Sequence, residues 1–197
     1  MKSVLRTNPF AFGAPRRNGE HLLLDMATSS SAGSSVTKSS EQGIQLEEGI
    51  AIDEIGNPIT DPDKVQSGSL LPFGGAKGFG IALMVEILSG VLTGAGFSHG
   101  VKSMYKNFEE SGDNGHFFMA IDIEKIIPLE SYYDRMDELL DSVKSSAEGF
   151  KDKEVFFPGE MRWAEYQTSL ANGITLDQKT TSSLKQLSKE LNVNFDW

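Results

Sequence analysis

Short apolar runs that alternate along the chain with periodic, helix-like segments predict an α/β or α+β protein. Three runs suit strands, at residues 21–24, 49–53 and 116–123; the first suits a buried strand, and the last is the clearest of them. Residues 129–143 and 184–191 repeat apolar side chains every three or four positions, which is typical of amphipathic helices. We therefore expect strands and helices to share one domain.

The composition is that of a globular protein of one domain. The 197 residues carry a formal net charge of −10, and no run of Lys or Arg offers a nucleic-acid surface. The chain has no cysteine, which excludes disulfides and thiolate metal sites. No stretch approaches the roughly 18 apolar residues of a membrane span, and residues 1–6 lack the apolar core of a signal peptide. We expect a cytoplasmic protein that binds neither nucleic acid nor membrane.

The N-terminal part begins with residues 7–15, which are rich in turn formers and aromatic side chains, and continues through a turn at residues 16–19. The first strand, residues 21–24, ends at Asp25. An acidic residue at that place suits a contact with a ribose or substrate hydroxyl, although a helix cap or a turn residue is the simpler interpretation. The serine-rich residues 28–40 predict either a mobile loop or a capped helix start.

A glycine-rich loop at residues 74–80 holds four glycines and Lys77. The residues that follow, up to about Leu92, are apolar on nearly every face and predict a buried helix. Free N–H groups and the helix dipole favour a phosphate at such a start, whereas many glycine-rich loops only turn the chain. The spacing matches neither a Walker A loop nor the G-x-G-x-x-G dinucleotide fingerprint. A phosphate loop and a tight turn are therefore both open interpretations.

Three further segments complete the organisation of the chain. Residues 105–115 are polar and predict a surface loop, residues 151–154 a charged turn, and residues 155–157 a short strand. The tail helix follows a start that is rich in Thr and Ser, which predicts a capped helix on the surface.

No side chain in the sequence identifies itself as a general acid or base. The three histidines, at positions 21, 99 and 116, are scattered and lack the spacing of metal ligands, so a structural role is the simpler one. Glu86 is the one charge within the apolar helix. If it is buried, it needs a salt bridge or hydrogen-bond partners.

Six motifs, in a set order, give the chain a specific resemblance. They are Thr7-Asn8-Pro9-Phe10-Ala11-Phe12, Leu24-Asp25-Met26-Ala27-Thr28-Ser29, Asp53 with residues 56–62, Leu71-Pro72-Phe73-Gly74-Gly75-Ala76-Lys77-Gly78, residues 117–122, and Pro158-Gly159-Glu160. On these motifs the chain resembles the malate/L-lactate dehydrogenase family of the non-Rossmann type. That family also includes ureidoglycolate, sulfolactate and diketogulonate enzymes and reductases of cyclic imines.

The resemblance implies a fold and an activity. The fold would be α/β, with a mixed sheet and flanking helices in a non-Rossmann arrangement whose N-terminal part is missing. Residues 1–165 would form an incomplete NAD(P)-binding domain, and residues 166–197 a C-terminal helical segment. The activity would be hydride transfer between NAD or NADP and a small 2-hydroxy or 2-keto acid, by a homodimer without a metal site. The residues do not choose between NAD and NADP, or among the acids.

The resemblance also implies site residues. Thr7 would lie near the substrate, and Lys77 would bring its charge to the phosphates at the helix start. The expected cofactor contacts, in chain order, are Leu24, Asp25, Met26, Ala76, Lys77, Gly159, Glu160 and Met161.

The chain departs from the family pattern in three ways. Arg6 stands where a glycine usually precedes Thr-Asn-Pro, and Ser34 and Ser35 replace a Gly-Lys or Gly-Asp pair, which weakens a substrate role there. Family members also carry a long preceding segment that includes the catalytic histidine. We therefore expect the chain alone to be weakly active or inactive, and its apolar helix faces to be partly exposed.

Three origins are consistent with these departures. The chain would be the cofactor-binding portion of a dehydrogenase, from a truncated gene, a split gene or a mis-assigned start. It would alternatively be a non-catalytic nucleotide-binding module that acts through a partner, or a structural remnant that binds no nucleotide.

Overall fold

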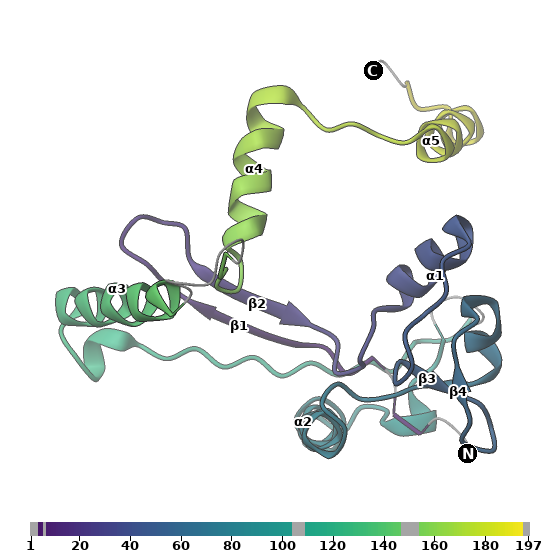
Figure 1. The fold of residues 1–197 in the computed structure, drawn as a ribbon, viewed down its shortest axis with the longest axis horizontal. Helices are drawn as coiled ribbons and strands as arrows, with labels where there is room; N and C mark the ends of the chain where they lie inside the picture. Colours follow the sequence, from purple (N-terminus) through teal and green to yellow (C-terminus); the bar gives the residue numbers. More distant parts are fainter. Residues whose placement is uncertain (1–3, 6, 104–108, 147–153, 195–197) are drawn as a thin grey trace. The chain divides into compact units, whose positions relative to one another are not determined.

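The structure, a computed structural model, describes residues 4–5, 7–103, 109–146 and 154–194, and Figure 1 shows its elements in chain order. Two compact units make up the chain. The first combines Met1–Ala14 with Leu23–Met136, and the second combines Pro15–Leu22 with Asp137–Trp197. Residues 15–22 thus leave the first unit, and the chain returns to it for most of its length.

Two small sheets hold the strands. β1 (Phe10–Ala14) pairs with β2 (Leu22–Met26), and the two run in opposite directions (Figure 1). β3 (Ala51–Ile52) lies between β4 (Pro58–Ile59) and β5 (Ser69–Leu70) and is antiparallel to both. Ala51 pairs with both neighbours and has no exposed surface, so it forms the centre of this sheet.

The first unit also contains the helix that follows the glycine-rich loop. This helix, α2 (Ala76–Glu86), continues directly into a π-helical turn, η2 (Ile87–Val91). α1 (Gly33–Gln42) packs against the 3₁₀ turn η1 (Pro62–Ser67). Two more 3₁₀ turns follow, η3 (Ser98–Gly100) and η4 (Ile123–Lys125).

The second unit is mainly helical. α3 (Leu129–Ser145) begins in the first unit and ends in the second, which also contains α4 (Glu160–Asn172) and α5 (Gln178–Leu191). The indole N–H of Trp163 donates to the carbonyl oxygen of His21 at 2.8 Å. The Arg16 guanidinium lies 4.8 Å from the centre of the Phe157 ring. These contacts fasten residues 15–22 to the C-terminal part of this unit.

The buried apolar set is small, and every member except Phe157 is aliphatic: Ala14, Val36, Leu46, Ala51, Ile59, Ala82, Leu140 and Phe157. No helix in the described ranges is long and apolar enough to cross a membrane. Over the same ranges, no group of three His, Asp or Glu side chains is arranged to hold a metal ion.

The prediction of a strand at residues 116–123 is wrong. The structure has an extended stretch there that pairs with no strand in the described chain, and Figure 1 draws it as a long run without an arrow. Phe118 and Met119 are 89% and 75% exposed. Apolar residues correctly indicate extended backbone, but a strand also needs a hydrogen-bonded neighbour.

Two other expectations are also wrong. Residues 155–157 form no strand, because no described segment pairs with them, although Phe157 is buried. α2 is not buried on every face. Its buried residues are Gly78, Ala82 and Glu86, while Phe79 and Leu83 are 51% and 44% exposed because no described segment covers them.

Other expectations are confirmed. The turn at 16–19, the strand that carries Asp25, the strand near Ala51 and the helices α3 and α5 are all present. The serine-rich segment takes its helical alternative, as α1, although no side chain caps the helix start. Apolar faces of α3 and α5 are partly exposed, with Leu139 at 56% and Leu187 at 47%. The expected loop at 105–115 and turn at 151–154 lie partly outside the described residues.

Candidate functional site

The loop that leads into α2 depends on its glycines. Gly74 and Gly75 have φ of 57° and 63°, a left-handed conformation that side chains other than glycine rarely adopt. Gly78, in the first turn of the helix, lies so close to the chain that a Cβ there would be 1.9 Å from the carbonyl oxygen of Phe73. The loop and the helix start are therefore folded tightly onto each other.

The start of α2 has no side-chain cap. Its first backbone bond runs from the N–H of Phe79 to the carbonyl of Gly75 at 3.0 Å, so the N–H groups of Ala76, Lys77 and Gly78 have no partner in the described chain. The Lys77 side chain is exposed, and within those residues it makes no ion pair or hydrogen bond. These donors lie at the positive end of the helix dipole, where Ala76 and Lys77 are exposed.

This helix start fits an anionic group. Three unpartnered N–H donors, an ammonium and no acidic residue in the first turn all favour a phosphate. A Cβ placed at Gly74 or Gly75 would meet nothing within 4 Å, so the space beside the loop is open. The phosphates of a dinucleotide are thus compatible with the residues present.

Thr28 joins the segments that the sequence assigns to substrate and cofactor. Its N–H and its hydroxyl both lie 3.2 Å from the carbonyl oxygen of Thr7, and its own carbonyl accepts from the N–H of Phe73 at 3.1 Å. Thr28 is 2% exposed and follows β2 by two residues. The structure therefore brings Thr7, the end of β2 and the approach to the glycine loop together in the first unit.

The three expected residues of β2 differ in exposure. Leu24 and Met26 are half-buried, and Asp25 between them is exposed, as expected for alternating faces of a strand. The strand continues past Asp25 to Met26, so the carboxylate lies within the strand and not beyond its end. Asp25 thus lies on the exposed face of β2.

The third expected contact, at residues 159–161, lies in the second unit. Gly159 is left-handed, with φ of 96°, and begins α4. The Glu160 carboxylate accepts from the N–H of Phe157 at 3.1 Å and pairs with Lys144, so it already closes a local turn. Met161 is 65% exposed. In this turn the exposed side chain is Met161, while the Glu160 carboxylate has internal partners.

Glu86 has the partners that its burial requires, as expected. It is 7% exposed, and its carboxylate accepts from the side-chain amide of Asn8 at 3.1 Å and from the N–H of Ser98 at 2.9 Å. Sequence reasoning missed the roles of Asn8, Ser98 and Thr28. For Asn8, its place inside the Thr-Asn-Pro motif is a signal that could have directed attention to it.

The carboxyl groups with shifted pKa lie in turns and caps. A hydrogen bond from the Asn57 side chain lowers the pKa of Asp53. The Lys64 side chain does the same for Asp61, and the N–H of Thr180 lowers the pKa of Asp177. The hydrogen bonds that cause these shifts stabilise local turns and caps. None of the three carboxyl groups lies in the loop that precedes α2.

Comparison with known proteins gives a family and a fold. The family model for malate/L-lactate dehydrogenase matches residues 1–185. The L-sulfolactate dehydrogenase of Methanothermobacter thermautotrophicus is 36% identical over 195 residues, which are 99% of this chain and 55% of the relative. The (2R)-3-sulfolactate dehydrogenase (NADP(+)) of Chromohalobacter salexigens is 40% identical over 116 residues, 59% of this chain and 35% of the relative.

The likeness extends to three dimensions. The solved structure of a sulfolactate dehydrogenase from Methanocaldococcus jannaschii aligns with a TM-score of 0.84 at 36% identity, over 98% of this chain and 55% of that one. The expected α/β fold is thereby confirmed, and the chain spans about 55% of the length of such relatives. Sequence and fold agree over nearly the whole chain, which therefore belongs to the malate/L-lactate dehydrogenase family.

Proposed function

We propose that this chain supplies the cofactor-binding part of an oxidoreductase that moves a hydride between NAD or NADP and a small 2-hydroxy or 2-keto acid. The observation that carries the proposal is the start of α2, where three N–H groups and the Lys77 ammonium lack partners in the described chain. Because such a start attracts phosphate, it suits the pyrophosphate of a dinucleotide. The names of two relatives, both sulfolactate dehydrogenases and one with NADP(+), support this class of acid and cofactor.

The expected site residues of the first unit have different roles in this proposal. Gly74 and Gly75 turn the backbone so that its N–H groups reach the phosphates, with Ala76 and Lys77 beginning the helix. Asp25, flanked by Leu24 and Met26, accepts from a ribose hydroxyl. Thr7 contributes its side-chain hydroxyl near the substrate. When bound, the nicotinamide ring supplies or takes up the hydride, which no side chain can do.

The second unit contributes the turn at residues 159–161. Because the Glu160 carboxylate has internal partners, Gly159 and Glu160 would contact the cofactor through their backbone, and Met161 through its exposed side chain. Residues 1–165 would form the cofactor domain and residues 166–197 the helical segment after it. The assembly would be a cytoplasmic homodimer.

Oxidation of a hydroxy acid also requires a base for the hydroxyl proton and a cation for the carboxylate. His21 is already engaged, because its Nδ1 accepts from the N–H of Arg16 at 3.0 Å. We assign the base and the cation to the part of the relatives that this chain does not match. The purified 197-residue chain should therefore not oxidise NADH with oxaloacetate or pyruvate above background. Steady turnover of either acid would contradict this assignment.

Cofactor binding is tested by titrating the purified chain with NADH and with NADPH and following their fluorescence. At least one should give a saturable signal. Lys77→Met should raise its dissociation constant about tenfold, since loss of one charge–phosphate contact costs about 1.4 kcal/mol. Lys38→Met, which removes the same charge from an exposed position on α1, is the control and should bind as the wild type does.

The proposal fails if neither nucleotide gives a saturable signal with the wild-type chain. An equal loss of affinity in the Lys77 and Lys38 variants would show that net charge, and not the start of α2, attracts the nucleotide.

A further inference from the structure

The C-terminal end of α2 forms a closed hydrogen-bond cluster around a buried carboxylate. Glu86 accepts from the Asn8 amide and from the N–H of Ser98, and no cation of the described chain pairs with it. Both partners are donors. Only an acidic side chain offers two acceptor oxygens, so a glutamine at this position would have to abandon one of the two bonds.

Both donors belong to residues with strained backbone. Among the described residues, four that are not glycine have a positive φ, and these include Asn8 at 41° and Ser98 at 53°. Side chains other than those of asparagine and aspartate rarely adopt this left-handed conformation. The shared carboxylate bonds directly to both residues and therefore helps to hold both conformations.

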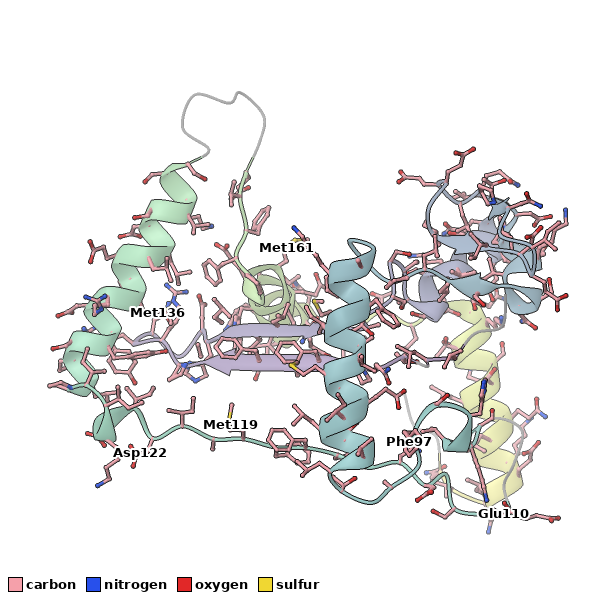
Figure 2. The ribbon with its side chains drawn as sticks, turned by 90° about the horizontal axis from the view of Figure 1, so that it is seen from below. Phe97, Glu110, Met119, Asp122, Met136 and Met161 are labelled. Atoms are coloured by element: carbon pink, nitrogen blue, oxygen red, sulfur yellow. The ribbon has the colours of Figure 1, made fainter. Side chains whose placement is uncertain are left out.

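Gly90, in the π-helical turn η2, lets the chain at Phe97 and Ser98 approach the C-terminal end of α2. A Cβ on Gly90, within that turn, would lie 2.9 Å from the Cβ of Phe97, so only glycine allows this close approach. Figure 2 shows Phe97 beside the C-terminal end of α2. Ser98 follows directly and donates its N–H to the carboxylate. A π-turn inside an α-helix often marks a functional site.

The cluster also anchors the segment that contains Thr7. The Ser98 hydroxyl donates to the carbonyl of Val4 at 3.0 Å, and the Asn8 amide lies 3.3 Å from the carbonyl of Ala82. The Thr7 carbonyl is held by Thr28, while the Thr7 side chain is exposed and makes no hydrogen bond within the described residues. Thr7 is thus fixed on both sides and leaves its hydroxyl available.

We propose that Glu86 is a positioning residue that, through Asn8, fixes the Thr7 hydroxyl relative to α2. The same helix carries Lys77 at its other end, so one rigid element sets the spacing between the substrate side and the cofactor side. The functional meaning rests on the proposed function, because Thr7 is there assigned to the substrate and Lys77 to the cofactor.

Hydrogen–deuterium exchange of the purified full chain tests the proposal through the peptide of residues 4–10. Glu86→Gln should speed exchange of this peptide about tenfold, the effect of losing one hydrogen bond to a charged group. The double variant Glu86→Gln with Asn8→Asp should restore slow exchange in part, because the new amide can donate to the new carboxylate and still accept from Ser98, while the bond from residue 8 to the Ala82 carbonyl stays lost. Glu48→Gln removes the same charge at an exposed position and should change nothing.

Two further variants keep the test decisive. Asn8→Ala leaves Glu86 intact and should also speed exchange of residues 4–10, even if Glu86→Gln does not fold. Lys77→Met should weaken NADH binding while leaving this exchange at the wild-type rate. Failure of the wild type to bind NADH or NADPH would refute the proposed function alone.

The positioning role is overturned by either of two results. One is unchanged exchange of residues 4–10 in Glu86→Gln or, if that variant does not fold, in Asn8→Ala. The other is faster exchange across the whole first unit without rescue by the double variant, because Glu86 would then serve only overall stability.

Discussion

The starts of α2 and α5 differ in how the N–H groups of the first helical turn find hydrogen-bond acceptors. At α5 the Asp177 carboxylate accepts from the N–H and the hydroxyl of Thr180, both at 2.8 Å, so the first turn is capped by its own chain. At α2 two left-handed glycines take the place of a cap, and the first three N–H groups have no partner in the described residues. The chain itself supplies acceptors at the start of α5, whereas the N–H groups at the start of α2 would need an added anion as their acceptor.

The difference separates stability from function. A cap contributes to helix stability wherever a helix begins, so its omission next to an exposed lysine is informative. α4 is intermediate, because Glu160 in its first turn bonds back to the N–H of Phe157. Of these three helix starts, α2 is the one that lacks both a side-chain cap and an acidic residue in its first turn.

The largest effect is expected from filling the close approach at the start of α2. Gly78→Ala places a Cβ 1.9 Å from a backbone oxygen that cannot move aside, which should cost about 3 kcal/mol of unfolding free energy and abolish NADH binding. Urea unfolding followed by circular dichroism gives the first value, and fluorescence titration the second.

Gly80→Ala is the matched control for this variant. A Cβ there meets nothing within 4 Å, and alanine is the better helix former, so this variant should be more stable by about 0.5–1 kcal/mol. Equal stability of the two variants would show that the tight fold at Gly78 is not required.

A smaller change would make the start of α2 resemble that of α5. Gly74→Asp adds a carboxylate in a left-handed position that aspartate tolerates, and the space for its Cβ is open. The carboxylate should compete with the phosphate for the free N–H groups and weaken NADH or NADPH binding about tenfold. Gly74→Asn is the uncharged counterpart and should lose less affinity; the same loss in both variants would point to backbone strain instead.

The smallest effect concerns α5 and acid. Hydrogen bonds, first from the N–H of Thr180, lower the pKa of Asp177 below its ordinary 3.8. The stabilisation by the charged cap is therefore complete above the ordinary pKa and is lost as pH falls through the lowered value. Far-UV circular dichroism of the wild type should show a small loss of helix below about pH 4.

Two variants isolate this step. Asp177→Ala should begin with less helix at neutral pH and lack the step, while Asp177→Asn, which caps without titrating, should keep its helix. An unchanged acid step in Asp177→Ala would assign it to other carboxyl groups.

Sequence reasoning succeeds where the structure depends on local chemistry. The glycine spacing predicts the turn and helix start at residues 74–80, and periodicity predicts α3 and α5. Glu86 within an apolar helix predicts a buried, bonded carboxylate. Each of these features is determined by residues that are close together in the chain.

Sequence reasoning fails where a structural feature depends on contacts between segments that are far apart in the chain. The partners of Glu86 lie 78 and 12 residues away, at Asn8 and Ser98, and no local pattern indicates them. The extended run at 116–123 has strand composition but no neighbour, and β1 and α4 went unrecognised because turn formers and polar residues obscure their pattern. The candidate site shows the same division, because Lys77 is predicted from its loop while Thr28 emerges only from the fold.

The extended run also has a consequence for handling the protein. Phe117, Phe118, Met119 and Ile121 are between 44% and 89% exposed, on backbone that makes no ladder in the described chain. Such a stretch is a template for cross-β stacking between molecules. Phe118→Lys, which places a charge at the most exposed of the four positions, should keep concentrated samples clear during the long titrations that the cofactor experiments require.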